Sequence, residues 1–154
     1  MNTAVATAAA PDAIHPRARG LAVAGLAPFV LLTLLVWLVG DRSDEAHAFV
    51  SRGLALWAAL VVSFLGAIHW GLAMHGAADP APHYASGVLL LVPAWIGAVM
   101  PPYSGLVVEG VCLVVAYLLD RRHYPALGAA GWLNLRFRLS AIAALCCFLG
   151  AAGC

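Results

Sequence analysis

Two ionisable side chains, His69 and Glu109, lie inside long apolar runs of the sequence. His69 belongs to Ser63–Gly71, which reads Ser-Phe-Leu-Gly-Ala-Ile-His-Trp-Gly, and Glu109 lies between Val108 and Gly110. Ionisable groups at membrane depth are rare and usually functional, so both are candidates for a ligand or proton site. Each also has a structural interpretation, as a hydrogen-bonded packing histidine and as a carboxylate near enough to the membrane surface to reach water.

Depth in the membrane argues against a direct pair between these two residues. With a rise of about 1.5 Å per residue, His69 lies about 9 Å from the inner end of its run and Glu109 about 6 Å from the outer end. In a hydrocarbon core about 30 Å thick, roughly 15 Å then separates them. A polar cavity near His69 and Glu109 for a small molecule, a quinone or a proton is therefore the alternative interpretation and not the first one.

No arrangement typical of catalysis occurs in the sequence. It contains no nucleophile–base pair, no Gly-rich phosphate loop and no His-x-x-Glu-His-type motif, so no catalytic residue is proposed. The four cysteines form no Cys-x-x-Cys pair, and no two histidines have metal-ligand spacing. We therefore expect no metal site and no cofactor, and an enzyme is not favoured.

The composition places these residues in a membrane protein. Of the 154 residues 64% are hydrophobic and 10% are charged, whereas soluble domains carry about 25% charged residues. The apolar residues come in runs long enough to cross a bilayer as helices, which predicts an all-α integral membrane bundle. A formal net charge of +1, with the basic residues scattered over several loops, argues against a nucleic-acid partner.

The apolar runs predict five transmembrane helices. They lie at about residues 21–39, 53–74, 84–100, 105–119 and 133–152, and together form a single membrane domain over residues 21–154. Residues 1–20 are Ala-rich without an apolar face, so they are predicted to be a disordered tail. Asp41 to Arg52 is predicted to be the first connecting loop. The first run is too long for the apolar part of a signal peptide and is interpreted as a retained span.

Arginine residues predict the orientation of the bundle. Basic loops stay on the cytoplasmic side, and six of the eight Arg fall on the side of the amino terminus: Arg17, Arg19, Arg121, Arg122, Arg136 and Arg138. Only Arg42 and Arg52 fall on the other side. The expected location is a bacterial inner membrane with the amino terminus in the cytoplasm.

Two surfaces of the predicted bundle are candidates for contacts with other molecules. Small side chains recur every four residues on the second span, at Ala59, Ser63, Ala67 and Gly71. Such a stripe favours close helix packing within the bundle, or a homodimer contact. His69 points nearly opposite to this stripe. The second surface consists of Arg121, Arg122, Arg136, Arg138 and Trp132, which are expected to contact lipid headgroups of the inner leaflet or to dock a protein partner.

Four motifs carry a resemblance to a known family. They are Ser63–Leu72, Pro93–Trp95, Ala116–Arg121, and Trp132 followed by Leu135–Leu139. Over roughly residues 53–150 the chain resembles domain-of-unknown-function family 3429, which includes the eukaryotic transmembrane protein 69-like proteins. The resemblance implies a compact multi-span protein of bacterial inner membranes or organelles, with no established activity and no catalytic residues to carry over. In the family pattern Arg often holds the position of His69, which argues against an axial-ligand role, and Glu109 matches no family motif.

The first interpretation is therefore a non-enzymatic accessory or assembly partner of a membrane complex. Its partners are the lipid bilayer and a possible membrane-protein partner. The alternative is a protein that binds or transports a small molecule, quinone or proton. The two differ in whether the polar residues converge at one site or lie separately at helix ends.

Overall fold

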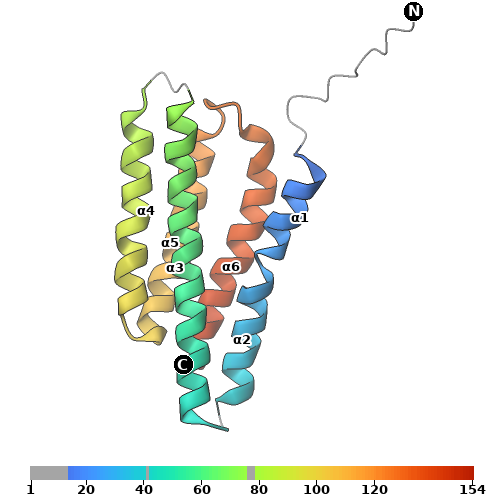
Figure 1. The fold of residues 1–154 in the computed structure, drawn as a ribbon, viewed down its shortest axis with the longest axis vertical. Helices are drawn as coiled ribbons and strands as arrows, with labels where there is room; N and C mark the ends of the chain where they lie inside the picture. Colours follow the sequence, from blue (N-terminus) through green and yellow to red (C-terminus); the bar gives the residue numbers. More distant parts are fainter. Residues whose placement is uncertain (1–13, 41, 76–78) are drawn as a thin grey trace, which may run out of the picture.

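The computed structural model describes residues 14–40, 42–75 and 79–154, which form helices joined by short connections (Figure 1). In chain order these are α1 (Pro16–Ala24), α2 (Ala27–Val39), α3 (Asp44–Met74), α4 (Ala81–Val99), α5 (Pro102–His123), the 3-10 helix η1 (Ala130–Trp132) and α6 (Leu133–Gly153). Helices account for 86% of the described residues, and these residues include no strand. The predicted all-α class is confirmed.

Five helical segments are long and apolar enough to cross a membrane. They are Pro16–Val39, Asp44–Met74, Ala81–Val99, Pro102–His123 and Ala130–Gly153, with mean hydropathies of 1.3 to 2.5 over their most apolar windows. Large apolar side chains such as Leu34, Phe64 and Trp95 are exposed on the outside of the bundle. A surface of this kind suits hydrocarbon and not water, so the chain is a multi-pass membrane protein.

The first helix begins inside the segment predicted as a tail. α1 starts at Pro16, whose missing N–H costs no bond at the first position of a helix. The Nδ1 atom of His15 accepts a hydrogen bond from the backbone N–H of Arg17 at 3.2 Å, which caps this end. Residues 1–13 of the predicted tail lie outside the described residues.

The second span is longer than its apolar run. α3 begins at Asp44 and not near residue 53, so most of the segment predicted as the first loop is helical, while Asp41 lies outside the described residues. Ser43 caps the helix by accepting a hydrogen bond from the backbone N–H of Ala46 at 3.3 Å. Asp44 and Glu45 follow in the first turn, where negative charge is favourable. The 31 residues of α3 span about 46 Å, so its charged end extends beyond a hydrocarbon core of about 30 Å.

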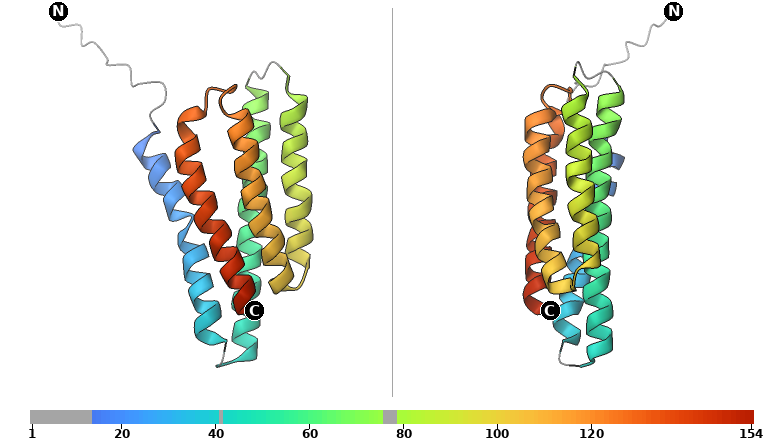
Figure 2. Two further views of the ribbon diagram at one scale, coloured as in Figure 1. Left: turned by 180° about the vertical axis from the view of Figure 1, so that it is seen from behind. Right: turned by 90° about the vertical axis from the view of Figure 1, so that its left-hand side faces the viewer.

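α3 is the helix that connects the bundle. It contacts α2, α4, α5 and α6, and α5 packs along α6 as its antiparallel neighbour (Figure 2). The backbones of α3 and α4 approach closely at Gly66, where an added Cβ would lie 2.8 Å from the carbonyl oxygen of Gly87. Small residues at such crossings let helix backbones pack closely in lipid.

The two ends of the bundle differ in charge. The start of α1, the end of α3, the start of α4, the end of α5 and the start of α6 lie at one end, and the carboxyl terminus lies at the opposite end (Figures 1 and 2). The first end carries six of the eight Arg residues and is called the Arg-rich end below. The candidate site lies near it.

Candidate functional site

A buried ion pair joins the end of α5 to the start of α6. Asp120 is fully buried and Arg136 is 8% exposed. The Nε atom of Arg136 donates a hydrogen bond to Oδ2 of Asp120 at 2.7 Å, and its Nη2 atom lies 2.7 Å from the same oxygen. The chain reverses between the two helices at Gly128, whose φ of 69° lies in the region that favours glycine.

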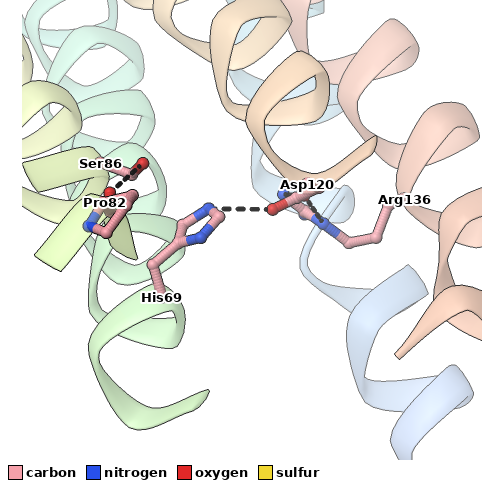
Figure 3. A network of polar contacts seen from close by, with 5 residues as sticks. All are labelled: His69, Pro82, Ser86, Asp120 and Arg136. Carbon is pink, nitrogen blue, oxygen red and sulfur yellow. Dashed lines mark hydrogen bonds and ion pairs between the residues drawn. The ribbon is translucent and has the colours of Figure 1, made fainter. Parts of the chain in front are cut away.

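His69 extends this pair into a chain of contacts from α3 to α6 (Figure 3). Its Nε2 atom lies 3.1 Å from Oδ1 of Asp120, so the two carboxylate oxygens face different partners. The imidazole is fully buried. The distance suits a hydrogen bond but the alignment does not, and neither ring nitrogen has a hydrogen-bond partner among the described residues.

Two more histidines approach His69 from other helices. His83 lies in the first turn of α4, and His123 is the last residue of α5. The ring centroids of His83 and His123 are 4.6 Å apart, and those of His69 and His123 are 5.4 Å apart. One ring nitrogen from each of the three residues lies within 4.8 Å of the others. We call His69, His83 and His123 the three-histidine cluster.

The ring nitrogens of this cluster are poorly satisfied. Nδ1 of His69, His83 and His123 is buried without a hydrogen-bond partner in the described part of the chain. Buried side-chain nitrogens in folded proteins nearly always have a partner, because losing water without replacing its hydrogen bond costs stability. The cluster therefore brings together three histidines that each have a buried ring nitrogen without a partner among the described residues.

Tyr124 lies beside His69, just beyond the end of α5. Its side chain is buried, and its ring centroid lies 6.1 Å from that of His69. Burial raises the pKa of the Tyr124 hydroxyl above its ordinary value, and the negative charge of Asp120 adds to the shift. Tyr124 is therefore a neutral phenol that can donate or accept a hydrogen bond.

The cluster lies close to the membrane surface at the Arg-rich end. His69 is five residues before Met74, the last residue of α3, which is about 8 Å of helix. His83 and His123 lie at helix ends and are 8% and 9% exposed. The site is therefore shielded by protein, yet only about one or two helical turns from water.

Glu109 lies in a different part of the bundle. Eleven residues of α5, or about 16 Å of helix, separate it from Asp120. Its side chain is fully buried beside Gly97 of α4, where an added Cβ would lie 2.5 Å from Oε1. Neither of its oxygens has a hydrogen-bond partner in the described structure. The structure brings His69 to Asp120 and not to Glu109.

The residues of the small-residue stripe differ in exposure. Ala59 is buried, Ser63 is half-buried, and Ala67 and Gly71 are exposed. The hydroxyl of Ser63 donates a hydrogen bond to the carbonyl oxygen of Ala59 at 2.8 Å. The opposite face, which carries His69, is the buried one along this part of α3.

The basic residues of the Arg-rich end also separate into two groups. Arg121, Arg122 and Arg138 are exposed, and Trp132 is half-buried. Arg136, which was grouped with them in the sequence, is instead buried against Asp120. Its charge therefore compensates the buried carboxylate of Asp120 inside the bundle.

A groove lies beside the ion pair and not at the histidines. It has a volume of about 380 Å³, runs along α1, α2, α3 and α6, and is lined mostly by apolar side chains such as Phe29 and Trp57. Arg136 and Ser140 are its polar lining residues. The groove is mostly apolar, whereas the histidine cluster brings three ionisable side chains together.

The sequence analysis missed His83, His123 and Asp120 as site residues. Each lies in a segment between two predicted spans. A signal was nevertheless present, because these segments and the inner end of the second span belong to the same side of the predicted topology. Residues at one level of a five-helix bundle can meet whatever their separation in sequence.

Comparison with known proteins gives a family and no activity. No curated protein and no solved structure shows a significant match to this chain. The model of one family, described as protein of unknown function (DUF3429), matches residues 14–152. The resemblance in the motifs is confirmed, and the chain belongs to the DUF3429 family.

Proposed function

We propose that the protein is a membrane-embedded binding protein whose site is the three-histidine cluster, supported by Asp120 and Arg136. The observation that carries the proposal is the convergence of these ionisable side chains from four helices at one buried point. Burying such groups in a membrane protein is costly, and they are retained mainly where they have a function. A small ligand that satisfies the ring nitrogens would offset part of this cost.

The ion pair gives the site a defined geometry. Arg136 fixes one oxygen of Asp120, which leaves the other oxygen directed at Nε2 of His69. A small turn of the ring would align this contact as a hydrogen bond, and the carboxylate would then orient the imidazole with Nδ1 facing away from it. In its neutral form an imidazole has one nitrogen with a free lone pair, which can accept a hydrogen bond or bind an ion.

Glu109 stays outside this site. Helix geometry places it about 16 Å from Asp120, and its side chain lies against Gly97 of α4. A single polar cavity that contains both His69 and Glu109 is therefore not part of the proposal.

A second candidate function is that of an accessory or assembly partner of a membrane complex. The observation that favours it is the group of exposed cations at the Arg-rich end, Arg121, Arg122 and Arg138. No carboxylate of the described residues forms an ion pair with them. Such a surface suits anionic headgroups or an acidic protein segment.

The proposed location is a bacterial inner membrane with the Arg-rich end in the cytoplasm. The support is the ratio of six Arg to two between the two sides, since basic segments are retained on the cytoplasmic side. The site would then be reached from the cytoplasm or from the inner leaflet.

Native mass spectrometry of the protein, extracted gently from its own membrane, tests the proposal. We expect one non-polypeptide adduct of fixed mass, which is lost in His69→Leu and kept in His75→Leu. His75 is the matched control because it follows α3 and is exposed, outside the cluster. His69→Leu leaves the Asp120–Arg136 pair intact, so the variant should fold. A bound polypeptide in both variants, without any adduct, would contradict the proposal and support the accessory function.

A further inference from the structure

We propose that the ligand of the three-histidine cluster is a late first-row divalent metal ion such as Zn²⁺, coordinated by one nitrogen each of His69, His83 and His123. This inference rests on the proposed function and names the chemical class of its ligand. It depends on the number, type and spacing of the ring nitrogens, on the acidic partner of His69, and on the position of the cluster in the membrane.

The spacing of the nitrogens is close to that of a metal site. In a tetrahedral zinc site with bonds of about 2.0 to 2.1 Å, ligand nitrogens lie about 3.3 Å apart. The three imidazoles each offer a nitrogen within 4.8 Å of the others. Side-chain rotations that bring these atoms closer by about 1.5 Å would complete the set, and histidine χ2 is a soft torsion.

The ligand set selects the class of metal. Three imidazoles suit Zn²⁺, Co²⁺, Ni²⁺ and Cu²⁺, whereas Mg²⁺ and Ca²⁺ require oxygen ligands. No oxygen-bearing side chain belongs to the cluster of described ligand atoms. Three protein ligands leave one coordination position for water or for another molecule.

Asp120 supplies the partner that metal-binding histidines usually have. A ligating imidazole commonly donates its second ring N–H to a carboxylate, which orients the ring and makes the ligand more basic. Oδ1 of Asp120 lies 3.1 Å from Nε2 of His69, and a small turn of the ring would align the two atoms for a hydrogen bond, with Nδ1 of the same ring left for the metal. Because Oδ2 is held by Arg136, Asp120 is a positioning residue and not itself a ligand.

The position of the cluster near the membrane surface lowers the energetic cost of holding a cation there. The ion pair of Asp120 and Arg136 has no net charge, so a divalent ion adds uncompensated charge to the site. At the centre of a bilayer that charge would be prohibitive. His83 and His123 instead lie at helix ends with 8% and 9% of their surface exposed, where water can complete the coordination shell.

Metal titration of the full-length protein tests the inference. The protein is purified in lipid nanodiscs with an affinity tag that lacks histidine, stripped with a chelator, and titrated with Co²⁺ alone and then with Zn²⁺ alone. We expect one Co²⁺ per chain, with visible absorption bands of a four-coordinate site that disappear when Zn²⁺ displaces it. Failure of the wild-type protein to bind one ion saturably would overturn the inference, and this result needs no variant.

Variants locate the ion. Asp120→Asn removes the partner of a ligand and should weaken Co²⁺ binding by about 10- to 100-fold. His83→Ala and His123→Ala each remove a ligand and should weaken Co²⁺ binding by more than that. His75→Ala should bind as the wild type does. Binding that survives both cluster variants places the ion elsewhere and overturns the inference.

The outcomes separate this inference from the proposed function. An adduct of organic mass in native spectra, lost in His69→Leu, together with no metal binding, would retain the binding site and reject the metal. No adduct and no metal binding would reject both.

Discussion

At the residue scale, the central group is Asp120, because its two carboxylate oxygens face two different side chains. Arg136 hydrogen-bonds to one oxygen, and His69 approaches the other. A buried carboxylate in this position is stable only while its charge is compensated. The contact with Arg136 therefore both stabilises the buried charge of Asp120 and holds its other oxygen near His69.

Removing Asp120 alone should be more harmful than removing the whole pair. Asp120→Leu leaves the guanidinium of Arg136 buried without its partner, which typically costs about 3–5 kcal/mol. The double variant Asp120→Leu/Arg136→Leu removes both charges and should recover most of that loss. Reversible unfolding in mixed detergent micelles measures both free energies. Equal losses in the single and double variants would show that the pair is not a buried charge pair.

Glu109 should behave as a destabilising residue of the bundle interior. Its carboxyl group is fully buried and has no hydrogen-bond partner in the described structure. Glu109→Met keeps an unbranched side chain of similar length and removes the unpartnered polar atoms. The free energy of unfolding should rise by about 1–3 kcal/mol in the same detergent assay. Glu109→Gln, which keeps a polar group, is the control and should gain little. A loss of stability in Glu109→Met would mean that the carboxyl group has a favourable partner.

At the element scale, the packing of α3 on α4 depends on glycine. An added Cβ at Gly66 would lie 2.8 Å from the carbonyl oxygen of Gly87, which belongs to a helix backbone and cannot rotate away. Gly66→Ala should therefore destabilise the bundle by about 1–3 kcal/mol, as other overpacked contacts do. Gly71→Ala is the matched control, because a Cβ there meets nothing within 4 Å.

Unfolding of both glycine variants in detergent micelles distinguishes the contact from a general effect of helix propensity. Alanine favours a helix over glycine by about 1 kcal/mol. Gly71→Ala should thus be neutral or stabilising. If Gly66→Ala has the same free energy of unfolding as Gly71→Ala, then α3 and α4 do not approach as closely as the structure has them.

The spans of the bundle could be predicted because hydropathy reports them directly. Long apolar runs fixed the existence and order of the five membrane helices, although not their ends. Asp44 and Glu45 are polar, so the amino-terminal extension of α3 was interpreted as a loop, whereas a capping Ser43 and acidic residues in a first turn are also typical of a helix start. Hydropathy cannot distinguish a solvated helix from a solvated loop.

The candidate site was only partly predictable. His69 was identified because it interrupts an apolar run, but His83 and Asp120 lie at span ends, where polar residues are common and carry little information. Which of them meet depends on helix rotation and neighbour choice, and neither can be derived from one sequence. Arg136 shows the same limit, since an arginine at the membrane surface and one turned inward have the same sequence pattern.

At the scale of the whole molecule, the orientation of the bundle can be tested with its own cysteine. Cys154 is exposed at the end opposite to the Arg-rich end, and Cys112, Cys146 and Cys147 are buried. With the amino terminus in the cytoplasm, a membrane-impermeant maleimide should label wild-type protein in intact cells whose outer membrane is permeable to it. Cys154→Ser should abolish that labelling.

A second variant reports on the other side of the membrane. Arg122 is exposed at the Arg-rich end. The double variant Cys154→Ser/Arg122→Cys should be labelled only after the inner membrane is opened. The reverse pattern, with labelling of the double variant in intact cells, would show that the orientation is opposite to the one proposed.

The central claim is that three imidazoles from α3, α4 and α5 share one ligand near the Arg-rich end. X-ray absorption at the zinc edge, on wild-type protein loaded with one equivalent of Zn²⁺, tests it most directly because the spectrum counts imidazole ligands. The account predicts three imidazole nitrogens at about 2.0 to 2.1 Å and one further light atom. A first shell of oxygen or sulfur atoms with fewer than three imidazoles would contradict it.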